Sequence, residues 1–152
     1  MLAAAFELLT IPLFGVLSDR WTRRRTYMAG CVFLAAFAMP FFALLDTRDP
    51  VRIALAVVLA MNLGHAVLYS VQAALIPELF GTRLRCTGAS IGYQLGAVFA
   101  GGLAPLVAAT LVRYFPGSYW PLAAYVIVMA VVSWACVYRL AETSRRDLTA
   151  GE

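Results

Sequence analysis

Long apolar runs alternate with short charged segments along the whole chain. The runs cover residues 1–17, 27–45, 53–77, 86–112 and 120–138. Each run is close to the ~20 residues that a helix needs to cross a hydrocarbon core about 30 Å thick. In lipid, a helix satisfies its own backbone hydrogen bonds, whereas a lone strand leaves them unpaired. The pattern therefore predicts an all-α membrane protein, with a five-helix bundle over residues 1–141 and a tail over residues 142–152.

The composition agrees with lipid as the solvent of most of the chain. Of the 152 residues, 62% are hydrophobic and 13% are charged, and the mean hydropathy is +0.82. A water-soluble domain of this size needs more charge to cover its surface. The net charge of +4 does not indicate nucleic-acid binding, because the arginines lie in short loops between the apolar runs.

Cysteines give no sign of a metal centre. Cys31, Cys86 and Cys136 lie far apart in apolar segments, without the spacing of a metal site. We expect them to be packing residues, and we expect neither a metal ion nor a cofactor.

The arginines are divided unequally between the two ends of the predicted helices. One end holds nine and the other holds three: Arg20, Arg23, Arg24, Arg25, Arg83, Arg85, Arg139, Arg145 and Arg146 against Arg48, Arg52 and Arg113. Cytoplasmic loops carry the excess of positive charge in membrane proteins. We therefore expect a multi-pass protein of the cell (inner) membrane, with Met1 outside and the C-terminal tail in the cytoplasm.

Most side chains that could bind a polar solute lie in the first, third and fourth predicted spans. They are Glu7; Asn62, His65, Tyr69 and Gln72; and Ser90, Tyr93 and Gln94. Polar groups inside a membrane are costly and usually face a bundle interior or a water-filled cavity. Spans one, three and four are therefore predicted to line a cavity, and spans two and five to face lipid. Apart from Ser90, these residues are our candidates for a substrate and proton pathway.

Two of these candidates, Glu7 and His65, could take part in proton transfer. The four polar residues of the third span share one face of a helix, with His65 near the middle of the span. His65 could titrate near neutral pH, or it could be neutral and hold two helices together by a hydrogen bond. Glu7 is the only acid in any span and lies roughly 18 Å from Asp19 along a helix. It could carry protons, or it could reach water from a frayed helix end.

The fourth predicted span carries small residues at intervals of four and then a segment that weakens a helix. These residues are Gly88, Gly92, Gly96 and Ala100, followed by Gly101, Gly102 and Pro105. The first set allows two helix backbones to approach closely. The second set removes a backbone hydrogen bond and adds flexibility. A bendable helix beside a cavity suits alternating access, and ordinary packing with a static kink is the other interpretation.

The first charged loop has a recognisable order of residues. It reads Gly15-Val-Leu-Ser-Asp19-Arg20-Trp-Thr-Arg23-Arg24-Arg25. This resembles the signature loop of the major facilitator superfamily, with Thr22 in place of a glycine that supports the tight turn. A carboxylate at a helix end can meet the positive N-terminus of a neighbouring helix, and arginines can pair with acids and lipid phosphates. Such contacts could latch one conformation, or the loop could be only a topology signal.

A second charged loop strengthens the resemblance. Pro77-Glu78-Leu-Phe-Gly-Thr82-Arg83-Leu-Arg85 looks like the loop before the eleventh helix of that superfamily. With Gly64-His65 upstream and the glycine-rich fourth span downstream, the chain resembles the metabolite:proton symporters, which carry shikimate, 2-oxoglutarate, citrate, proline and betaine. The resemblance implies helices eight to twelve, with the seventh helix and the N-terminal half as missing partners. The latch residues that it implies are Gly15, Asp19, Arg20, Arg23, Arg24, Glu78, Arg83 and Arg85.

The resemblance also implies a function. It indicates a secondary active transporter, not an enzyme, that couples proton entry to uptake of a small carboxylate or zwitterionic metabolite by alternating access. A truncated remnant or membrane scaffold that does not transport is one alternative. An intramembrane serine protease with a Ser90–His65 dyad is a remote one, because residues 88–92 match Gly-x-Ser-x-Gly. That motif needs a strand, a turn and a helix, with the histidine later in the chain, whereas His65 precedes Ser90.

Overall fold

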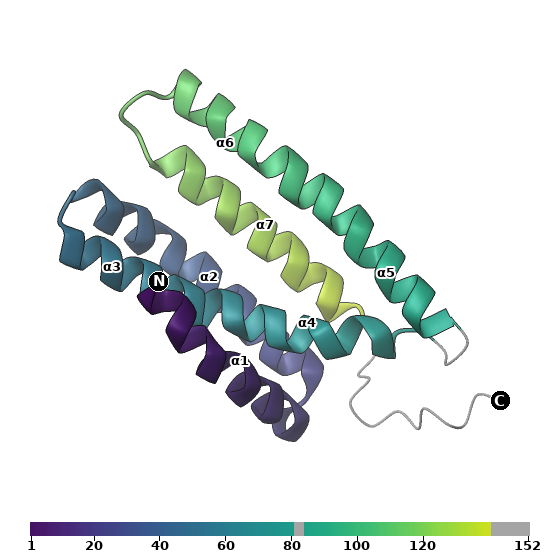
Figure 1. The fold of residues 1–152 in the computed structure, drawn as a ribbon. Coiled ribbons are helices and arrows are strands. Elements are labelled where there is room, and N and C mark those ends of the chain that lie inside the picture. The colour runs from purple at the N-terminus through teal and green to yellow at the C-terminus, as the bar shows by residue number, and fades with distance from the viewer. Residues whose placement is uncertain (81–83, 141–152) are drawn as a thin grey trace.

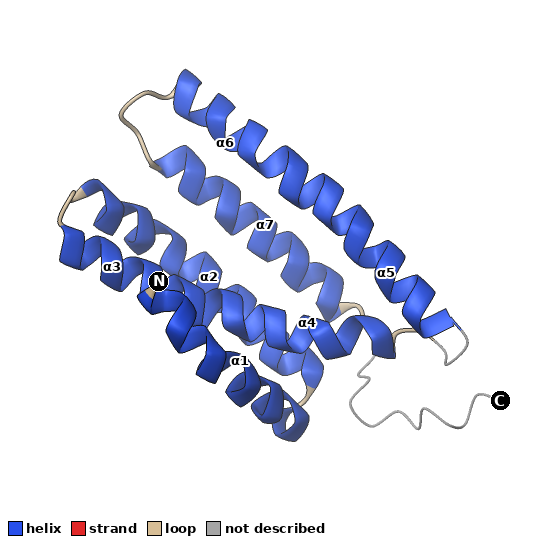
Figure 2. Ribbon diagram, viewed as in Figure 1, coloured by secondary structure: helices blue, strands red, loops and turns tan. Residues whose placement is uncertain are grey.

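The fold is entirely helical in the part that the structure, a computed structural model, describes: residues 1–80 and 84–140. The elements are α1 (Leu2–Trp21), α2 (Arg23–Asp46), α3 (Pro50–Leu59), η1 (Ala60–His65), α4 (Ala66–Glu78), α5 (Arg85–Gly96), η3 (Ala97–Gly102), α6 (Leu103–Tyr114) and α7 (Trp120–Tyr138). Figure 2 shows these helices joined by short loops. The two η elements are π-helical and interrupt longer helices.

Five of the resulting helices are long and apolar enough to cross a membrane. They are Leu2–Trp21, Arg23–Asp46, Pro50–Glu78, Arg85–Tyr114 and Trp120–Tyr138. The third contains α3, η1 and α4, and the fourth contains α5, η3 and α6. The prediction of an all-α membrane protein with five spanning helices is therefore confirmed.

Capping residues explain where two of the helices begin. The Asp49 carboxylate accepts a hydrogen bond from the backbone N–H of Val51 at 3.0 Å, and Pro50 occupies the first helical position of α3. Thr22 alone separates α1 from α2, and its hydroxyl accepts a hydrogen bond from Arg25 N. Thr22 has a φ of 134°, a conformation that favours glycine.

Helix α2 is the centre of the bundle. It packs most extensively against α7 and also contacts α1, α3, η1 and α4 (Figure 1). The α5–α6 helix lies at the outer edge beside α7, and most of its side chains are exposed. This differs from the prediction that the second and fifth spans face lipid while the fourth lines a cavity. The reason is that small buried residues, such as Gly30 and Ala38 of α2 and Ala130 of α7, allow close packing without any polar group.

Glycines that permit close helix approach lie in α2 and η1. A Cβ atom on Gly30 would lie 2.9 Å from Leu68 Cδ2, and one on Gly64 would overlap the Leu34 side chain. By contrast, Gly96, Gly101 and Gly102 have nothing within 4 Å of the corresponding position. Of the close approaches that we expected at the fourth span, only Gly88, next to Phe80, makes one, and the approach of helix to helix is found between α2 and the third span.

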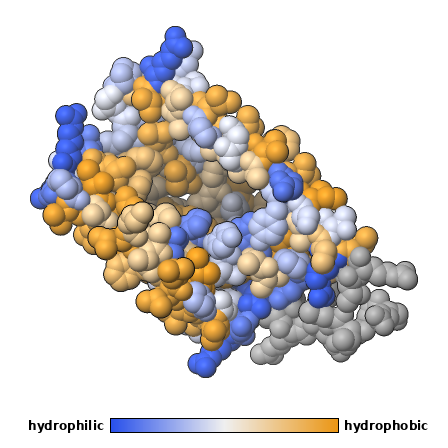
Figure 3. Space-filling model, in the orientation of Figure 1, coloured by the Kyte–Doolittle hydropathy of each residue, from blue (hydrophilic) through white to orange (hydrophobic). Residues whose placement is uncertain are grey.

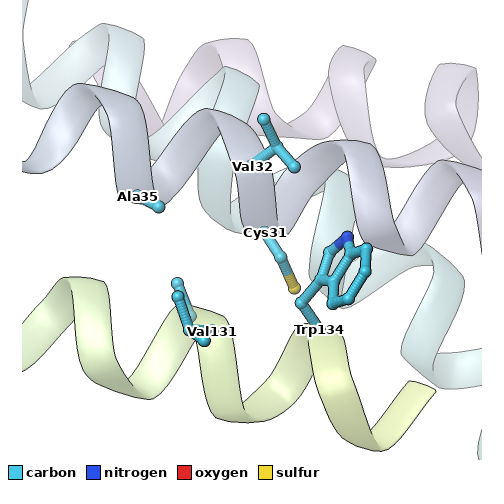
Figure 4. Close-up of a pocket in the computed structure, with 6 residues that line it drawn as sticks. Cys31, Val32, Ala35, Val131 and Trp134 are labelled. Carbon is cyan, nitrogen blue, oxygen red and sulfur yellow. The ribbon is translucent and has the colours of Figure 1, made fainter. Parts of the chain in front are cut away.

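A shallow apolar groove of about 150 Å³ lies between α2 and α7. Figure 4 shows the Cys31 sulfur directed from α2 towards the ring of Trp134 on α7. Cys31 is buried at 1% exposure, whereas Cys86 and Cys136 are exposed. The groove is lined only by apolar side chains, the Cys31 thiol and the Trp134 ring, so it is part of the helix packing.

The outer surface is largely apolar. Large hydrophobic side chains such as Leu8, Val98 and Val131 are more than half exposed. Figure 3 shows hydrophobic residues over much of one face, hydrophilic residues at the ends of the bundle and a hydrophilic patch near its middle. A soluble monomer rarely exposes so much apolar surface, so lipid or further helices are needed to cover it.

Candidate functional site

A contact between a carboxylate and an imidazole joins the first and third spans within the apolar bundle. Glu7 Oε1 of α1 lies 2.8 Å from His65 Nδ1 at the end of η1. The Glu7 side chain is 13% exposed and that of His65 is 55% exposed. An isolated carboxylate at this depth is costly, and the imidazole supplies the partner that offsets the cost. This contact is called here the Glu7–His65 pair.

Asn62 fixes η1 against α1 beside this pair. Its amide oxygen accepts a hydrogen bond from Thr10 Oγ1 at 2.9 Å, and its amide nitrogen donates to Val58 O at 2.9 Å and to Ala3 O at 3.4 Å. Asn62 is buried, with 6% exposure. Since a π-helical segment displaces backbone hydrogen bonds, a side chain that binds the Val58 carbonyl helps to stabilise it. Asn62 therefore holds the helices together and does not face a cavity here.

Aromatic rings extend the polar region from His65 towards α5. The His65 and Tyr69 rings are stacked, with centroids 5.5 Å apart and an angle of 21° between their planes. Tyr69 is half exposed, and Tyr93 of α5 is also exposed. Gln72 is half-buried and Gln94 is exposed. The structure thus brings Glu7, His65 and Tyr69 together, whereas Gln94 makes no hydrogen bond with another described residue.

Arg23 connects the two charged loops that the sequence singles out. Its guanidinium lies 2.5 Å from Asp19 Oδ1, 2.6 Å from Ser18 Oγ and 3.3 Å from Glu78 Oε1. The side chains of Arg23 and Glu78 are only 15% and 17% exposed, and that of Asp19 is 57% exposed. This set, called here the Arg23 junction, ties the end of α1 and the start of α2 to the end of α4.

The other predicted latch residues have different positions. The Arg24 guanidinium lies over the Tyr138 ring, 4.9 Å from its centroid, and so connects α2 to the end of α7. Arg20 is exposed and Arg85 is half-buried. Gly15 accepts a hydrogen bond from the Ser18 hydroxyl through its carbonyl. Arg83 lies outside the described residues.

The predicted weak point of the fourth span coincides with a change of helix type. Residues 97–102 are π-helical, and Pro105 follows in the first turn of α6. A Cβ atom on Gly88 would overlap the Phe80 ring, and one on Gly92 would only touch Ile76. Glycine and proline loosen the regular hydrogen-bond ladder, which explains the π-helical segment.

The family model of the Major Facilitator Superfamily matches residues 1–152. The chain belongs to the Major Facilitator Superfamily. It is 35% identical over 133 residues to the "Shikimate transporter" of Escherichia coli (strain K12), which covers 88% of the chain and 30% of the relative. It is 30% identical over 137 residues to the "Proline/betaine transporter" of Salmonella typhimurium, covering 90% of the chain and 27% of the relative. It is 26% identical over 125 residues to the "Citrate-proton symporter" of Klebsiella pneumoniae, covering 79% and 28%.

These similarities define the class of protein. The chain spans less than a third of the length of each of these three relatives. No solved structure matches it significantly. Membership in the Major Facilitator Superfamily makes the chain a multi-pass membrane protein of a transporter family, not an enzyme. The protease interpretation of Ser90 is therefore wrong, and in the structure Ser90 lies within the helix α5 and not at a strand–helix turn.

Sequence reasoning missed the pairing of Glu7 with His65 and the role of Thr10. A signal for the pairing is present. Glu7 is twelve residues before Asp19, and His65 is thirteen residues before Glu78. At 1.5 Å per residue these offsets are about 18 Å and about 20 Å. Since Asp19 and Glu78 meet at Arg23, the two ionisable groups lie at nearly the same depth.

Proposed function

We propose that the chain forms part of a proton-coupled symporter for a small carboxylate or zwitterionic metabolite, with the Glu7–His65 pair as its proton site. The observation that carries this proposal is the 2.8 Å contact between a shielded carboxylate and a half-exposed imidazole inside a membrane helix bundle. Ionisable groups at such depth are costly and are typical of proton pathways. The printed names of the relatives, which include a citrate-proton symporter, support the substrate class and the coupling ion.

The charge of the pair gives the coupling a definite sign. An ionised Glu7 beside a neutral His65 has a net charge of −1, and one added proton brings it to 0. The added proton removes repulsion towards a substrate carboxylate and leaves an imidazolium that can donate a hydrogen bond to it. Proton binding therefore favours substrate binding, and by linkage the substrate favours proton binding by the same factor.

The remaining candidates have supporting roles in this proposal. Tyr69, Gln72, Tyr93 and Gln94 supply donors and aromatic surface around the pair, and Asn62 holds η1 in position. The Arg23 junction is the conformational latch, since it must open when the end of α4 moves away from the α1–α2 turn. The π-helical segment of residues 97–102 is the place where the fourth span bends.

Further helices complete the transport path in this proposal. His65 and Tyr69 are each half exposed at the middle of a membrane span, and exposure of His65 to hydrocarbon would be unfavourable. The helices that cover them would come from an additional bundle, as the greater length of the relatives suggests. The two bundles would rock against each other around the Glu7–His65 pair. The 152-residue chain alone is then not expected to transport.

Proteoliposomes with an imposed proton gradient test the proposal. The chain is studied alone and fused behind the N-terminal part of the E. coli shikimate transporter, and uptake of labelled shikimate, citrate, proline and betaine is measured. We expect gradient-driven accumulation only in the fusion protein. Glu7→Gln should lower accumulation at least about 10-fold while exchange without a gradient persists. The control is Asp46→Asn, which should have no effect, because Asp46 is exposed and lies at the end of α2 far from the Arg23 junction.

Two outcomes would contradict the proposal. Saturable accumulation by the chain alone would show that no further helices are needed. Unchanged accumulation by Glu7→Gln and by His65→Gln, at matched protein levels in a functional fusion, would reduce the Glu7–His65 pair to a packing contact.

A further inference from the structure

The four arginines at the α1–α2 turn divide into two kinds. Arg23 and Arg24 are turned inward, one to Asp19 and Glu78 and the other onto the Tyr138 ring. The guanidinium groups of Arg20 and Arg25 make no ion pair or hydrogen bond with another described residue. Both are exposed. Within the described residues, two positive charges at this turn therefore have no acidic partner.

These two arginines border one hollow. Arg20, Trp21 and Arg25 line an open depression of about 500 Å³ at this end of the bundle. Trp21 is the last residue of α1 and is 63% exposed. Because a single residue joins α1 to α2, the two arginines are held close to the indole, and all three side chains line the same depression.

The position of this hollow favours a lipid as its ligand. Both α1 and α2 qualify as membrane spans, so their shared end lies at the level of the headgroups. Tryptophan concentrates at this level, where its ring meets acyl chains and its N–H meets water. Two guanidinium groups supply donors in the geometry that a phosphate accepts. A soluble anion would use the arginines but would gain nothing from the exposed indole.

We propose that Arg20, Trp21 and Arg25 form a binding site for the headgroup of an anionic phospholipid. The phosphodiester lies between the two guanidinium groups, and the glycerol backbone and upper acyl chain lie against the indole. The site does not include the Glu7–His65 pair or the Arg23 junction, so it holds whether or not the proposed transport mechanism is correct. Its occupation fixes the height of the α1–α2 turn in the headgroup layer.

Native mass spectrometry of the purified full chain tests the site. The chain is released from detergent with phosphatidylglycerol or phosphatidylcholine added at equal concentrations, and retained lipids are counted. We expect at least about 5-fold preference for phosphatidylglycerol. The double variant Arg20→Gln/Arg25→Gln should weaken phosphatidylglycerol binding roughly 10- to 30-fold, because each arginine near an anionic surface contributes about 1 kcal/mol.

Matched variants keep the test interpretable. Arg48→Gln/Arg113→Gln removes the same charge from two exposed arginines at the other end of the bundle and should leave the preference intact. Arg20→Lys/Arg25→Lys keeps the charge and should retain part of it. Circular dichroism verifies equal helix content, and quenching of Trp21 by a brominated phosphatidylglycerol, in a Trp120→Phe/Trp134→Phe background, reports the location.

Three results would overturn the proposal. The first is equal retention of the two lipids by the parent chain. The second is an equal loss of preference in the Arg20/Arg25 and Arg48/Arg113 double variants, which would indicate net charge alone. The third is full displacement of phosphatidylglycerol by millimolar inorganic phosphate, which would identify a site for free phosphate that does not use the indole.

Discussion

At the scale of single residues, Thr22 stands out because its backbone does not suit its side chain. Its φ of 134° lies in a region that glycine adopts readily and that is unfavourable for a β-branched residue. Such a residue costs on the order of 1–3 kcal/mol and persists only where its surroundings hold it. Here its hydroxyl accepts a hydrogen bond from Arg25 N, and its carbonyl accepts one from the Thr26 hydroxyl. The sequence showed Thr22 in the place of a glycine but not whether the turn had changed to accommodate it.

We expect Thr22→Gly to stabilise the chain. Relief of the backbone should exceed the few tenths of a kcal/mol lost with the N-cap hydroxyl and the roughly 0.5–1 kcal/mol of added chain entropy. The net gain is about 0–2 kcal/mol. Thermal unfolding in detergent, followed by circular dichroism, measures it. Thr47→Gly is the control, because Thr47 has an ordinary φ of −63° and should lose stability. A lower midpoint for Thr22→Gly would show that the turn is not strained.

At the scale of elements, η1 decides which side chains the third span presents to α1. A regular helix would have placed Asn62, His65 and Tyr69 on one face, as the sequence predicts. In the structure both Asn62 and His65 contact α1, through Thr10 and Glu7, but Asn62 is buried whereas His65 and Tyr69 are half exposed. A π-helical segment has more residues per turn than an α-helix, and it therefore rotates the helix beyond it. No periodicity in the sequence marks this segment, so the face could be predicted only in part.

Asn62→Leu should loosen the contact between η1 and α1. Leucine has a similar volume but leaves the Thr10 hydroxyl and the Val58 carbonyl without this partner. We expect a loss of about 1–3 kcal/mol in unfolding free energy. Gln94→Leu, which removes an exposed amide without a described hydrogen bond, should change it by less than about 0.5 kcal/mol. Equal effects of the two variants in denaturant titrations would argue against a specific role for Asn62.

The Arg23 junction also belongs to this scale, because it joins three helix ends. Glu78→Gln should destabilise the chain by about 1–3 kcal/mol, since it leaves the poorly exposed Arg23 guanidinium with less compensation. Asp19→Asn should cost less than about 1 kcal/mol, because the Asp19 carboxylate is largely solvated. Thermal unfolding of the two variants side by side gives the comparison. A larger effect for Asp19→Asn would assign the junction to that residue.

At the scale of the whole molecule, the number and class of the helices could be predicted, but their neighbours could not. Apolar length alone indicates five spans, because lipid leaves the backbone few choices. The central position of α2 depends on small residues such as Gly30, and these look like any others in an alanine-rich run. The positions of polar residues identified Glu7 and His65 as site candidates. They did not identify α2 and α7 as the helices that pack most extensively. Glu7 and His65 lie at nearly the same distance from the helix ends that meet at Arg23, and a comparison of these distances would have predicted their contact.

The orientation of the helix bundle in the membrane is also a property of the whole molecule. The Arg23 and Arg24 contacts gather the ends of α1, α4 and α7 and the start of α2 at one end of the bundle, which is the arginine-rich end. We expect this end in the cytoplasm. After replacement of Cys31, Cys86 and Cys136 by serine, whole cells are treated with an impermeant thiol reagent. Arg48→Cys should be labelled and Arg20→Cys should not. The reverse pattern would invert the topology.

The single-residue link between α1 and α2 also bears on biosynthesis. The two helices have 20 and 24 residues, with one residue between them. This link is too short for one helix to enter the membrane while the other stays outside it. We expect the translocon to release them as one hairpin, with the basic turn held back on the ribosome side throughout. A force profile of the arrested nascent chain should then show one broad pulling event for both helices. A twelve-residue glycine–serine insertion after Thr22 should split it into two, and two events in the parent would mean separate entry.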